Sequence, residues 1–231
     1  MLRAVTTICG PRGDRAAVLS TLFDDIQMVR PGERALIAID GFDGAGKSWL
    51  AAELVGLAVL RGGRPLFSVS IDGFHHPRAR RRAAGTGPEG FYRSSYRYDV
   101  FHEVVVDRLR AGLPVVPRVW DVVADEPVEA EHVIVPDDGI VIVDGIFLHR
   151  PELVDAWDAS VWLEVPFSVS VPRGNARFPG THDPEPDAAE NIRYVGGQRL
   201  YVAEVDPAGS ATWVIDNTDL ENPCRVAIEL S

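Results

Sequence analysis

Ile37-Ala38-Ile39-Asp40-Gly41-Phe42-Asp43-Gly44-Ala45-Gly46-Lys47-Ser48 is the stretch that decides the fold. A short apolar run leads into a glycine-rich turn, and residues 41–48 match the phosphate-loop pattern G-x-x-x-x-G-K-[ST]. The glycines let backbone N–H groups point at phosphate oxygens, and the N-terminus of the following helix faces the same anion. The residues that we expect to bind a nucleotide are Gly41, Asp43, Gly44, Ala45, Gly46, Lys47 and Ser48.

Lys47 is the only lysine of the chain, and the other 22 basic residues are arginines. A compact ammonium fits inside a phosphate loop, where a planar guanidinium does not replace it. We therefore predict that Lys47 holds the β- and γ-phosphates of ATP and takes part in catalysis. The Ser48 hydroxyl is predicted to bind Mg²⁺.

The composition is that of an ordinary globular domain, with 231 residues, 46% hydrophobic and 25% charged. We treat residues 1–231 as a single domain. The longest apolar runs stay below the roughly 18 residues of a membrane-spanning helix, and a net charge of −11 argues against a nucleic-acid surface. Cys9 and Cys224 have no metal-binding spacing, which favours a reducing, cytoplasmic location.

Short apolar runs alternate with helical patterns along the chain, which predicts an α/β fold. The expected strands are residues 35–39, 66–71, 140–143, 160–165 and 212–215. An N-terminal helix is expected over residues 14–30, with Asp14 as its cap, and a further helix over 48–61. The predicted architecture is a three-layer P-loop NTPase fold, with a mainly parallel sheet and helices on both faces.

Asp72 directly follows the strand expected over residues 66–71. The carboxyl end of a strand beside the phosphate-loop strand faces the ligand crevice of an open α/β sheet. At that place a carboxylate can accept the proton of a substrate hydroxyl during phosphoryl transfer. The alternative is that Asp72 only caps a turn.

The phosphate loop followed by Asp72-Gly73-Phe74-His75 resembles the uridine kinase and phosphoribulokinase group of P-loop kinases. Uridine kinases carry Asp-x-Phe-Tyr at this place and phosphoribulokinases carry Asp-x-Phe-His. The resemblance covers roughly residues 35–220 and implies that Asp72 is the catalytic base. We place Phe74 and His75 beside it among the substrate-binding residues.

Two further segments extend the resemblance. Asp144-Gly145-Ile146 stands where the group has Glu-Gly-Ile, which implies a Mg²⁺ role for Asp144, through a water because aspartate is one methylene shorter. Pro117-Arg118-Val119-Trp120-Asp121 resembles the Pro-x-Tyr-Asp segment with which uridine kinases hold the nucleoside. Trp120 and Asp121 are therefore predicted to bind substrate, although the histidine that follows in uridine kinases is missing here.

Two arginine-containing segments are candidates for mobile covers. Residues 77–98 show no clear periodicity and read as a flap-like insertion over an anionic substrate, with Tyr92 as a substrate contact, or else as a solvated arginine loop. Residues 166–187 read as a lid, because the kinase group carries lid arginines where Arg173 and Arg177 stand. Pro172 and Gly174 disfavour a regular helix there, and surface arginines are the alternative.

These observations predict an ATP- and Mg²⁺-dependent kinase that transfers the γ-phosphate to a hydroxyl of a small molecule. The resemblance implies a uridine kinase-like enzyme acting on a nucleoside or a sugar-like alcohol. We expect no nucleic-acid or membrane partner, and a homo-oligomer stays open. One alternative is a nucleoside-monophosphate kinase of the thymidylate type, in which Asp43 would touch the acceptor sugar. The other is a non-catalytic nucleotide-binding regulator, although no guanine-reading Asn-Lys-x-Asp occurs.

Overall fold

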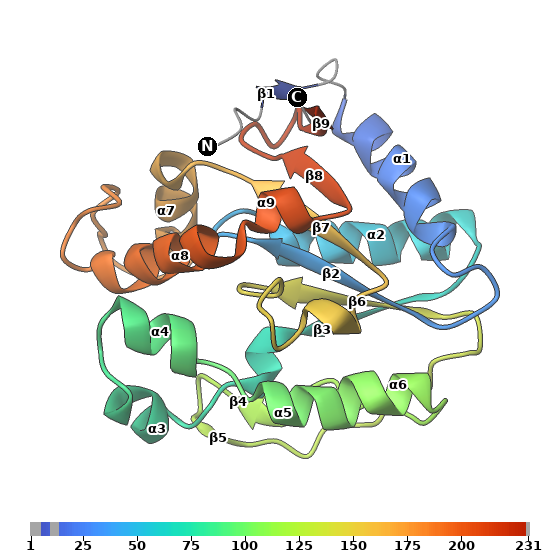
Figure 1. Cartoon of the computed structure of the whole chain (residues 1–231), viewed down its shortest axis with the longest axis horizontal. Helices are drawn as coiled ribbons and strands as arrows, with labels where there is room; N and C mark the ends of the chain where they lie inside the picture. The colour runs from blue at the N-terminus through green and yellow to red at the C-terminus, as the bar shows by residue number, and fades with distance from the viewer. Residues whose placement is uncertain (1–5, 10–13, 230–231) are drawn as a thin grey trace.

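The computed structural model describes residues 6–9 and 14–229 of the chain. The strands of its main sheet are β1 (Thr6–Cys9), β2 (Ala35–Gly41), β3 (Leu66–Ser70), β6 (Ile140–Gly145), β7 (Ala159–Glu164), β8 (Trp213–Asp216) and β9 (Cys224–Glu229). They lie in the order β1-β9-β8-β7-β2-β6-β3 (Figure 1). Two short strands, β4 (Trp120–Asp121) and β5 (Glu126–Pro127), pair separately.

Helices connect the strands and cover the sheet. They are α1 (Arg15–Gln27), α2 (Lys47–Arg61), α3 (Arg78–Ala83), α4 (Pro88–Ser94), α5 (Tyr98–Phe101), α6 (Arg108–Arg110), α7 (Phe167–Asn175), α8 (Ile192–Val205) and α9 (Pro207–Ser210). Three further helical segments are η1 (Ile71–Phe74), η2 (His102–Asp107) and η3 (Val154–Ala156). The segments α5, η2 and α6 follow one another without a gap. The predicted N-terminal helix is confirmed, and the Asp14 side chain accepts a hydrogen bond from the backbone of Ala16.

β2 lies at the centre of a parallel group of strands, between β6 and β7. Ile39 is in register with Asp144 on one side and Val161 on the other. All seven residues of β2 are buried, which explains its continuous apolar run, because a central parallel strand is covered on both faces. Parallel pairing also brings the carboxyl ends of β2, β3 and β6 to the same edge of the sheet.

The two faces of the sheet have separate hydrophobic cores. On one face, α1 and α2 pack Phe23 and Leu54 against Ile37 of β2. On the other face, Phe101 and neighbouring side chains of η1, α4 and η2 pack against Leu36. Figure 1 shows helices on both sides of the sheet. The predicted three-layer α/β fold is confirmed.

Two segments are more regular than the sequence predicts. Residues 77–98, expected to lack periodic structure, contain α3 and α4, and α4 packs along α8. These helices are too short to be stable alone, so tertiary packing supports them. The helix α7 forms although Pro172 lies inside it. Pro172 lacks an N–H donor, yet its carbonyl still accepts from Ala176 and continues the helix to its end.

The structure differs from the sequence-based expectation for the cysteines. Cys224 on β9 is disulfide-bonded, whereas the sequence argument treated the cysteines as reduced thiols. The cysteine argument therefore no longer supports the cytoplasmic prediction. None of the described helices combines the length and the apolar composition that crossing a membrane requires.

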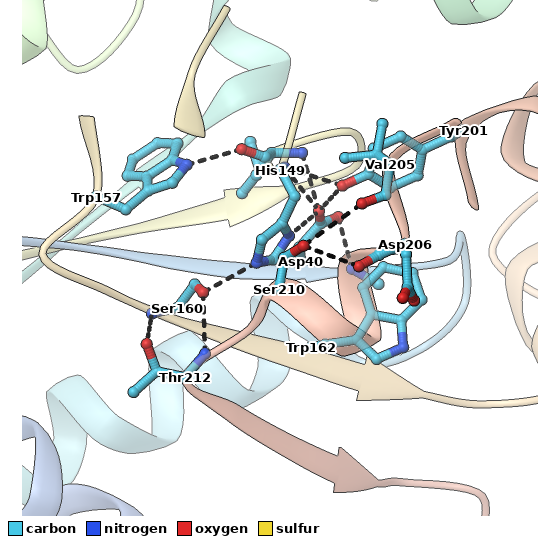
Figure 2. Close-up of polar contacts among 12 residues, drawn as sticks. Asp40, His149, Trp157, Ser160, Trp162, Tyr201, Val205, Asp206, Ser210 and Thr212 are labelled. Carbon is cyan, nitrogen blue, oxygen red and sulfur yellow. Dashed lines mark hydrogen bonds and ion pairs between the residues drawn. The ribbon is translucent and has the colours of Figure 1, made fainter. Parts of the chain in front are cut away.

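A buried hydrogen-bond network ties the last residues of β2 to three other parts of the fold. Asp40 is fully buried, and its Oδ1 accepts from the backbone N–H of Gly41 at 2.7 Å. Its Oδ2 accepts from the backbone N–H of Leu148 at 3.0 Å, from His149 Nδ1 at 2.8 Å and from the Tyr201 hydroxyl on α8. Figure 2 shows these side chains converging on Asp40.

The network continues through His149 to the next strand. His149 Nε2 lies 2.9 Å from Ser160 Oγ on β7. Ser160 Oγ also accepts from the backbone N–H of Thr212. Because Thr212 already donates to Ser160, the serine hydroxyl is free to donate to His149 while Nδ1 donates to Asp40. This network fixes the strand from which the phosphate loop begins to β7, to α8 and to the segment after β6.

We predict that Asp40→Asn lowers the free energy of unfolding by about 3 kcal/mol, because the buried carboxylate is lost and one of its two acceptor oxygens becomes an NH2 group that faces other donors. Urea unfolding followed by circular dichroism measures this difference. Asp24→Asn is the matched control, since Asp24 forms an exposed ion pair with Arg61, and such pairs contribute about 0–1 kcal/mol. Equal effects of the two substitutions would contradict the prediction.

Candidate active site

The phosphate loop joins β2 to α2 and has the backbone that its glycines require. Gly44 and Gly46 have φ of 76° and 98°, which side chains with a Cβ rarely adopt. Gly44 also lies under α7, where a Cβ would be 2.0 Å from the carbonyl oxygen of Ser170. Gly46 immediately precedes the first turn of α2. The loop therefore combines curled backbone with a helix N-terminus, the geometry of an anion-binding site.

Lys47 is buried at the start of α2, with 8% of its surface exposed. Its Nζ donates to the carbonyl oxygen of Phe42 at 2.7 Å. Burial lowers the pKa of Lys47, while the charges of Asp43, Asp40, Asp72 and Asp144 act in the opposite direction and raise it. Carboxylates from β2, the loop, η1 and β6 therefore lie near enough to affect the charge of this ammonium group.

Ser48 and Asp144 meet beside this lysine. Ser48 Oγ donates to Asp144 Oδ2 at 2.5 Å. Asp144 is buried, and this burial raises its pKa, although Ser48 and Lys47 act to lower it. A hydroxyl and a buried carboxylate supply the oxygen ligands that suit Mg²⁺. The predicted metal residues lie together, and their metal role stays a prediction.

Asp72 lies in η1, directly after β3, and is the most open of these carboxylates. Its Oδ1 accepts from the hydroxyl of Tyr96 at 2.9 Å. Its Oδ2 has no hydrogen bond to any residue that the structure describes, and 62% of the side chain is exposed. Burial, followed by the charge of Asp72, raises the pKa of Tyr96 well above its ordinary value, so the phenol stays a donor. One carboxylate oxygen is thus anchored and the other is open.

Two predicted substrate contacts are core residues. Phe74 is fully buried, and its ring packs edge-on against Phe101. Tyr92 is also buried, with the Arg150 guanidinium 4.5 Å from its ring centroid. Burial and a hydrogen bond to Glu204 raise the pKa of Tyr92 to about 12. Both side chains pack into the core because the adjoining helices cover them, and substrate binding by them stays a prediction.

The other three residues predicted to contact substrate, His75, Trp120 and Asp121, lie near the segment that carries Asp72. The His75 ring stacks at 4.4 Å from Tyr96, and its Nδ1 lies 2.9 Å from the carbonyl oxygen of Asp72. β4, which carries Trp120, packs against η1, and the buried Trp120 Nε1 has no partner among the described residues. Asp121 accepts from the backbone of Val123 and Ala124, so it stabilises a turn. Substrate binding by these residues stays a prediction.

The lid arginines lie on or just after α7, which rests on the phosphate loop. A Cβ on Gly174 would be 3.7 Å from Arg177 Nη2 and also 3.7 Å from the backbone nitrogen of Gly44. Arg177 is therefore close to the loop, and it pairs with no described carboxylate. Arg173 donates to the carbonyl oxygens of Asn217 and Thr218. Arg173 thus braces the segment after β8, while a catalytic role of either arginine stays a prediction.

Sequence reasoning missed several side chains that hold the site in place. Gln198 on α8 accepts from the backbone N–H of Asp43 at 2.7 Å, and Asn217 donates to the carbonyl oxygen of Ala45 at 2.8 Å. Tyr96 anchors Asp72, as described above. Asn217 follows the strand β8, so its place at a strand end was a usable signal. Gln198 and Tyr96 carry no comparable signal, because their contacts depend on how distant helices pack.

Comparisons with known proteins support the fold. The structure of a possible uridine kinase from Bacillus stearothermophilus is similar, with a TM-score of 0.69, 19% identity and coverage of 86% of this chain and 97% of that one. A candidate fructose transport system kinase from Silicibacter sp. TM1040 gives a TM-score of 0.66 and 24% identity, covering 83% and 95%. D-glycerate 3-kinase from Cryptococcus neoformans gives 0.53 and 12%, covering 83% and 87%.

At these identities the similarity establishes a shared fold. No protein-family model matches the sequence, and no curated protein matches it. The chain therefore has the α/β fold of solved P-loop kinases, as the sequence resemblance predicts.

We predict that Asp144→Asn stabilises the protein without ligands at pH 7. Burial raises the pKa of Asp144, so the fold favours its neutral form, and the stability from this group is lost as pH rises through that pKa. An amide keeps the Ser48 hydrogen bond without a buried charge. The urea midpoint should rise at pH 7, and the gain should vanish below the ordinary aspartate value of 3.8.

Asp144→Asn should also lose the part of its stabilisation by ATP that depends on Mg²⁺. The measurement is the rise in melting temperature on adding ATP, with and without the metal. Asp155→Asn, at an exposed position, is the control and should change neither quantity. A lower urea midpoint for Asp144→Asn, or an unchanged Mg²⁺ response, would contradict the assignment.

Proposed function

We propose that this protein is a phosphotransferase that moves the γ-phosphate of ATP to a hydroxyl group of a small molecule. The observation that carries the proposal is the placement of Lys47 and Asp72 at one edge of the sheet. The charge of Asp72 reaches Lys47, because it is among the carboxylates that raise the pKa of that lysine. A phosphate-binding group and an open carboxylate therefore lie close together.

The phosphate side of the proposed reaction uses the loop and the start of α2. Backbone N–H groups of the loop and the Lys47 ammonium would bind the phosphate oxygens. Lys47 Nζ donates to a loop carbonyl oxygen, Phe42 O, and this bond would exchange for a phosphate oxygen. Asn217, Gln198 and α7 support the loop from outside, which pre-organises these donors.

Ser48 and Asp144 supply the kind of ligand atoms that Mg²⁺ would need in the proposed reaction. Ser48 Oγ and Asp144 are oxygen ligands, and a cation between them would offset the burial cost of the Asp144 carboxylate. Among the described residues no group of three or more His, Cys, Asp or Glu side chains could hold a metal alone. Mg²⁺ normally takes one or two carboxylates together with substrate phosphates, which matches this arrangement. When bound, it would neutralise charge between the β- and γ-phosphates.

The acceptor side uses the open oxygen of Asp72. The Tyr96 hydroxyl holds Oδ1, so Oδ2 is the atom that would orient the acceptor hydroxyl and accept its proton. Arg177, close to Gly44 on the phosphate loop, would stabilise charge on the transferring group. The protein contributes positioning and charge neutralisation, the main requirements of phosphoryl transfer.

We predict that Asp72→Asn lowers kcat by about 100-fold or more, the contribution typical of a general base. The KM for ATP should change little, because the loop and Lys47 are intact. The measurement is acceptor-dependent ADP release with uridine, D-ribose, glycerol, D-glycerate and D-ribose 5-phosphate as acceptors. Asp24→Asn, on the exposed surface of α1, is the control for the loss of one carboxylate.

Near-normal turnover of Asp72→Asn would overturn the role of this carboxylate. Two outcomes would favour the alternatives. When thymidine and uridine monophosphates are added to the same panel, ADP release only with these monophosphates, with a diphosphate as product, would indicate the thymidylate type of kinase. ATP binding without ADP release for any of these compounds would indicate a non-catalytic nucleotide-binding protein.

A further inference from the structure

The arginines of this chain differ in whether they pair with acids. Nine described arginines form ion pairs with carboxylates: Arg15, Arg30, Arg34, Arg61, Arg93, Arg110, Arg150, Arg199 and Arg225. Pairing is expected, because the chain has 34 acidic residues and 23 basic ones. Arginines without an acidic partner are therefore informative.

Unpaired arginines gather around the turn that carries Asp72. Six of the eleven described arginines without an ion pair to a carboxylate belong to this part of the chain: Arg78, Arg80, Arg81, Arg82, Arg97 and Arg118. The other five, Arg64, Arg108, Arg173, Arg177 and Arg193, lie elsewhere in the fold. Arg78 and Arg81 donate only to backbone oxygens, those of Val123 and His76. In a protein with a net charge of −11, this is a local concentration of uncompensated positive charge.

Backbone contacts hold three of these arginines against the segment from Asp72 to His76. Arg118 lies on Gly73, where an added Cβ would be 2.6 Å from the Arg118 Cβ. The backbone N–H of Arg97 donates to the carbonyl oxygen of Phe74 at 2.8 Å. Arg81 Nε donates to the carbonyl oxygen of His76 at 2.9 Å. Three different parts of the chain thus place arginine residues beside the segment from Asp72 to His76, and the Arg81 guanidinium contacts it directly.

Nearby acids are engaged in other ways. Asp121 accepts from the backbone of Ala124 and Val123, and these bonds, with a smaller effect from the charge of Arg118, lower its pKa. Asp125 accepts from the backbone N–H of Arg78. Burial lowers the pKa of His76, and the charges of Arg80 and Arg97 lower it further, while Asp99 opposes them. Positive charge therefore outweighs negative charge at this histidine.

We infer that the acceptor is an anionic alcohol, a hydroxyl compound that carries a phosphate or a carboxylate group. The inference rests on the proposed function and names the class of substrate for the same site. Asp72 would face the hydroxyl, and Arg97 and Arg118 would bind the anionic group. Guanidinium groups bind phosphate and carboxylate through two parallel hydrogen bonds. A local basic cluster also offsets the repulsion between an anion and an acidic protein.

The test is calorimetric titration in the presence of Mg²⁺ and a non-hydrolysable ATP analogue. Two matched pairs are compared: D-ribose 5-phosphate with D-ribose, and D-glycerate with glycerol. The first pair tests for recognition of a phosphate group, and the second tests for recognition of a carboxylate group. We expect the charged member of at least one pair to bind at least tenfold more tightly. Raising the ionic strength should weaken only the charged member.

Arg97→Gln and Arg118→Gln should each weaken binding of that anion by about tenfold, the loss expected for one charge-assisted hydrogen bond. Binding of the ATP analogue should not change. Arg225→Gln is the matched control, because it removes the same charge from β9, at the far end of the sheet from β3, and it should leave the anion affinity unchanged. Thermal melting checks that each variant is folded.

Equal or tighter binding of the neutral members, or of uridine, would overturn the inference. So would failure of both anions to bind while the ATP analogue binds, or wild-type anion affinity in both arginine variants. Failure of the ATP analogue itself to bind would overturn the proposed function, and this inference with it.

Discussion

Burial of the Lys47 ammonium among carboxylates is the interaction on which the rest of this structure depends. A buried cation is costly unless opposite charges surround it, and here Asp40, Asp43, Asp72 and Asp144 raise its pKa against the effect of burial. Those carboxylates come from the ends of neighbouring parallel strands and the segments that follow them. The order of the strands therefore determines which acids lie near the lysine, and the same order brings together the glycine-rich loop, the Ser48–Asp144 pair and the open carboxylate of Asp72.

The phosphate loop is held in place by parts of the chain that lie far from it in the sequence. Asp40 connects its first residue to His149 and Tyr201 (Figure 2). Gln198 accepts a hydrogen bond from the backbone N–H of Asp43. The helix α8 thus contacts the loop directly through Gln198 and indirectly through Asp40, and it also packs against α4. A change in the position of α8 would therefore disturb the contacts that hold the phosphate loop.

Local sequence patterns predicted the fold and the centre of the site, because both depend on short-range rules. The glycine turn, the lone lysine and the acids at strand ends each follow from backbone geometry and strand order. The pattern did not show the burial of Phe74 and Tyr92, which depends on helices packed over them. It also missed Tyr96 and Gln198, since no local signal shows that a side chain will meet a residue far along the chain. The short helices α3 and α4 were missed for the same reason, because tertiary contacts support them.

The account as a whole requires that the loop ending at Lys47 binds the phosphates of a nucleotide. Isothermal titration of the folded protein with ATP and Mg²⁺ tests this requirement most directly, with Lys47→Met as the comparison. We expect one equivalent of nucleotide to bind the wild-type protein, and the variant to bind about 100-fold more weakly, the loss expected for charge-assisted bonds to the triphosphate. Absence of binding to folded wild-type protein, or equal affinity of the variant, would contradict the account.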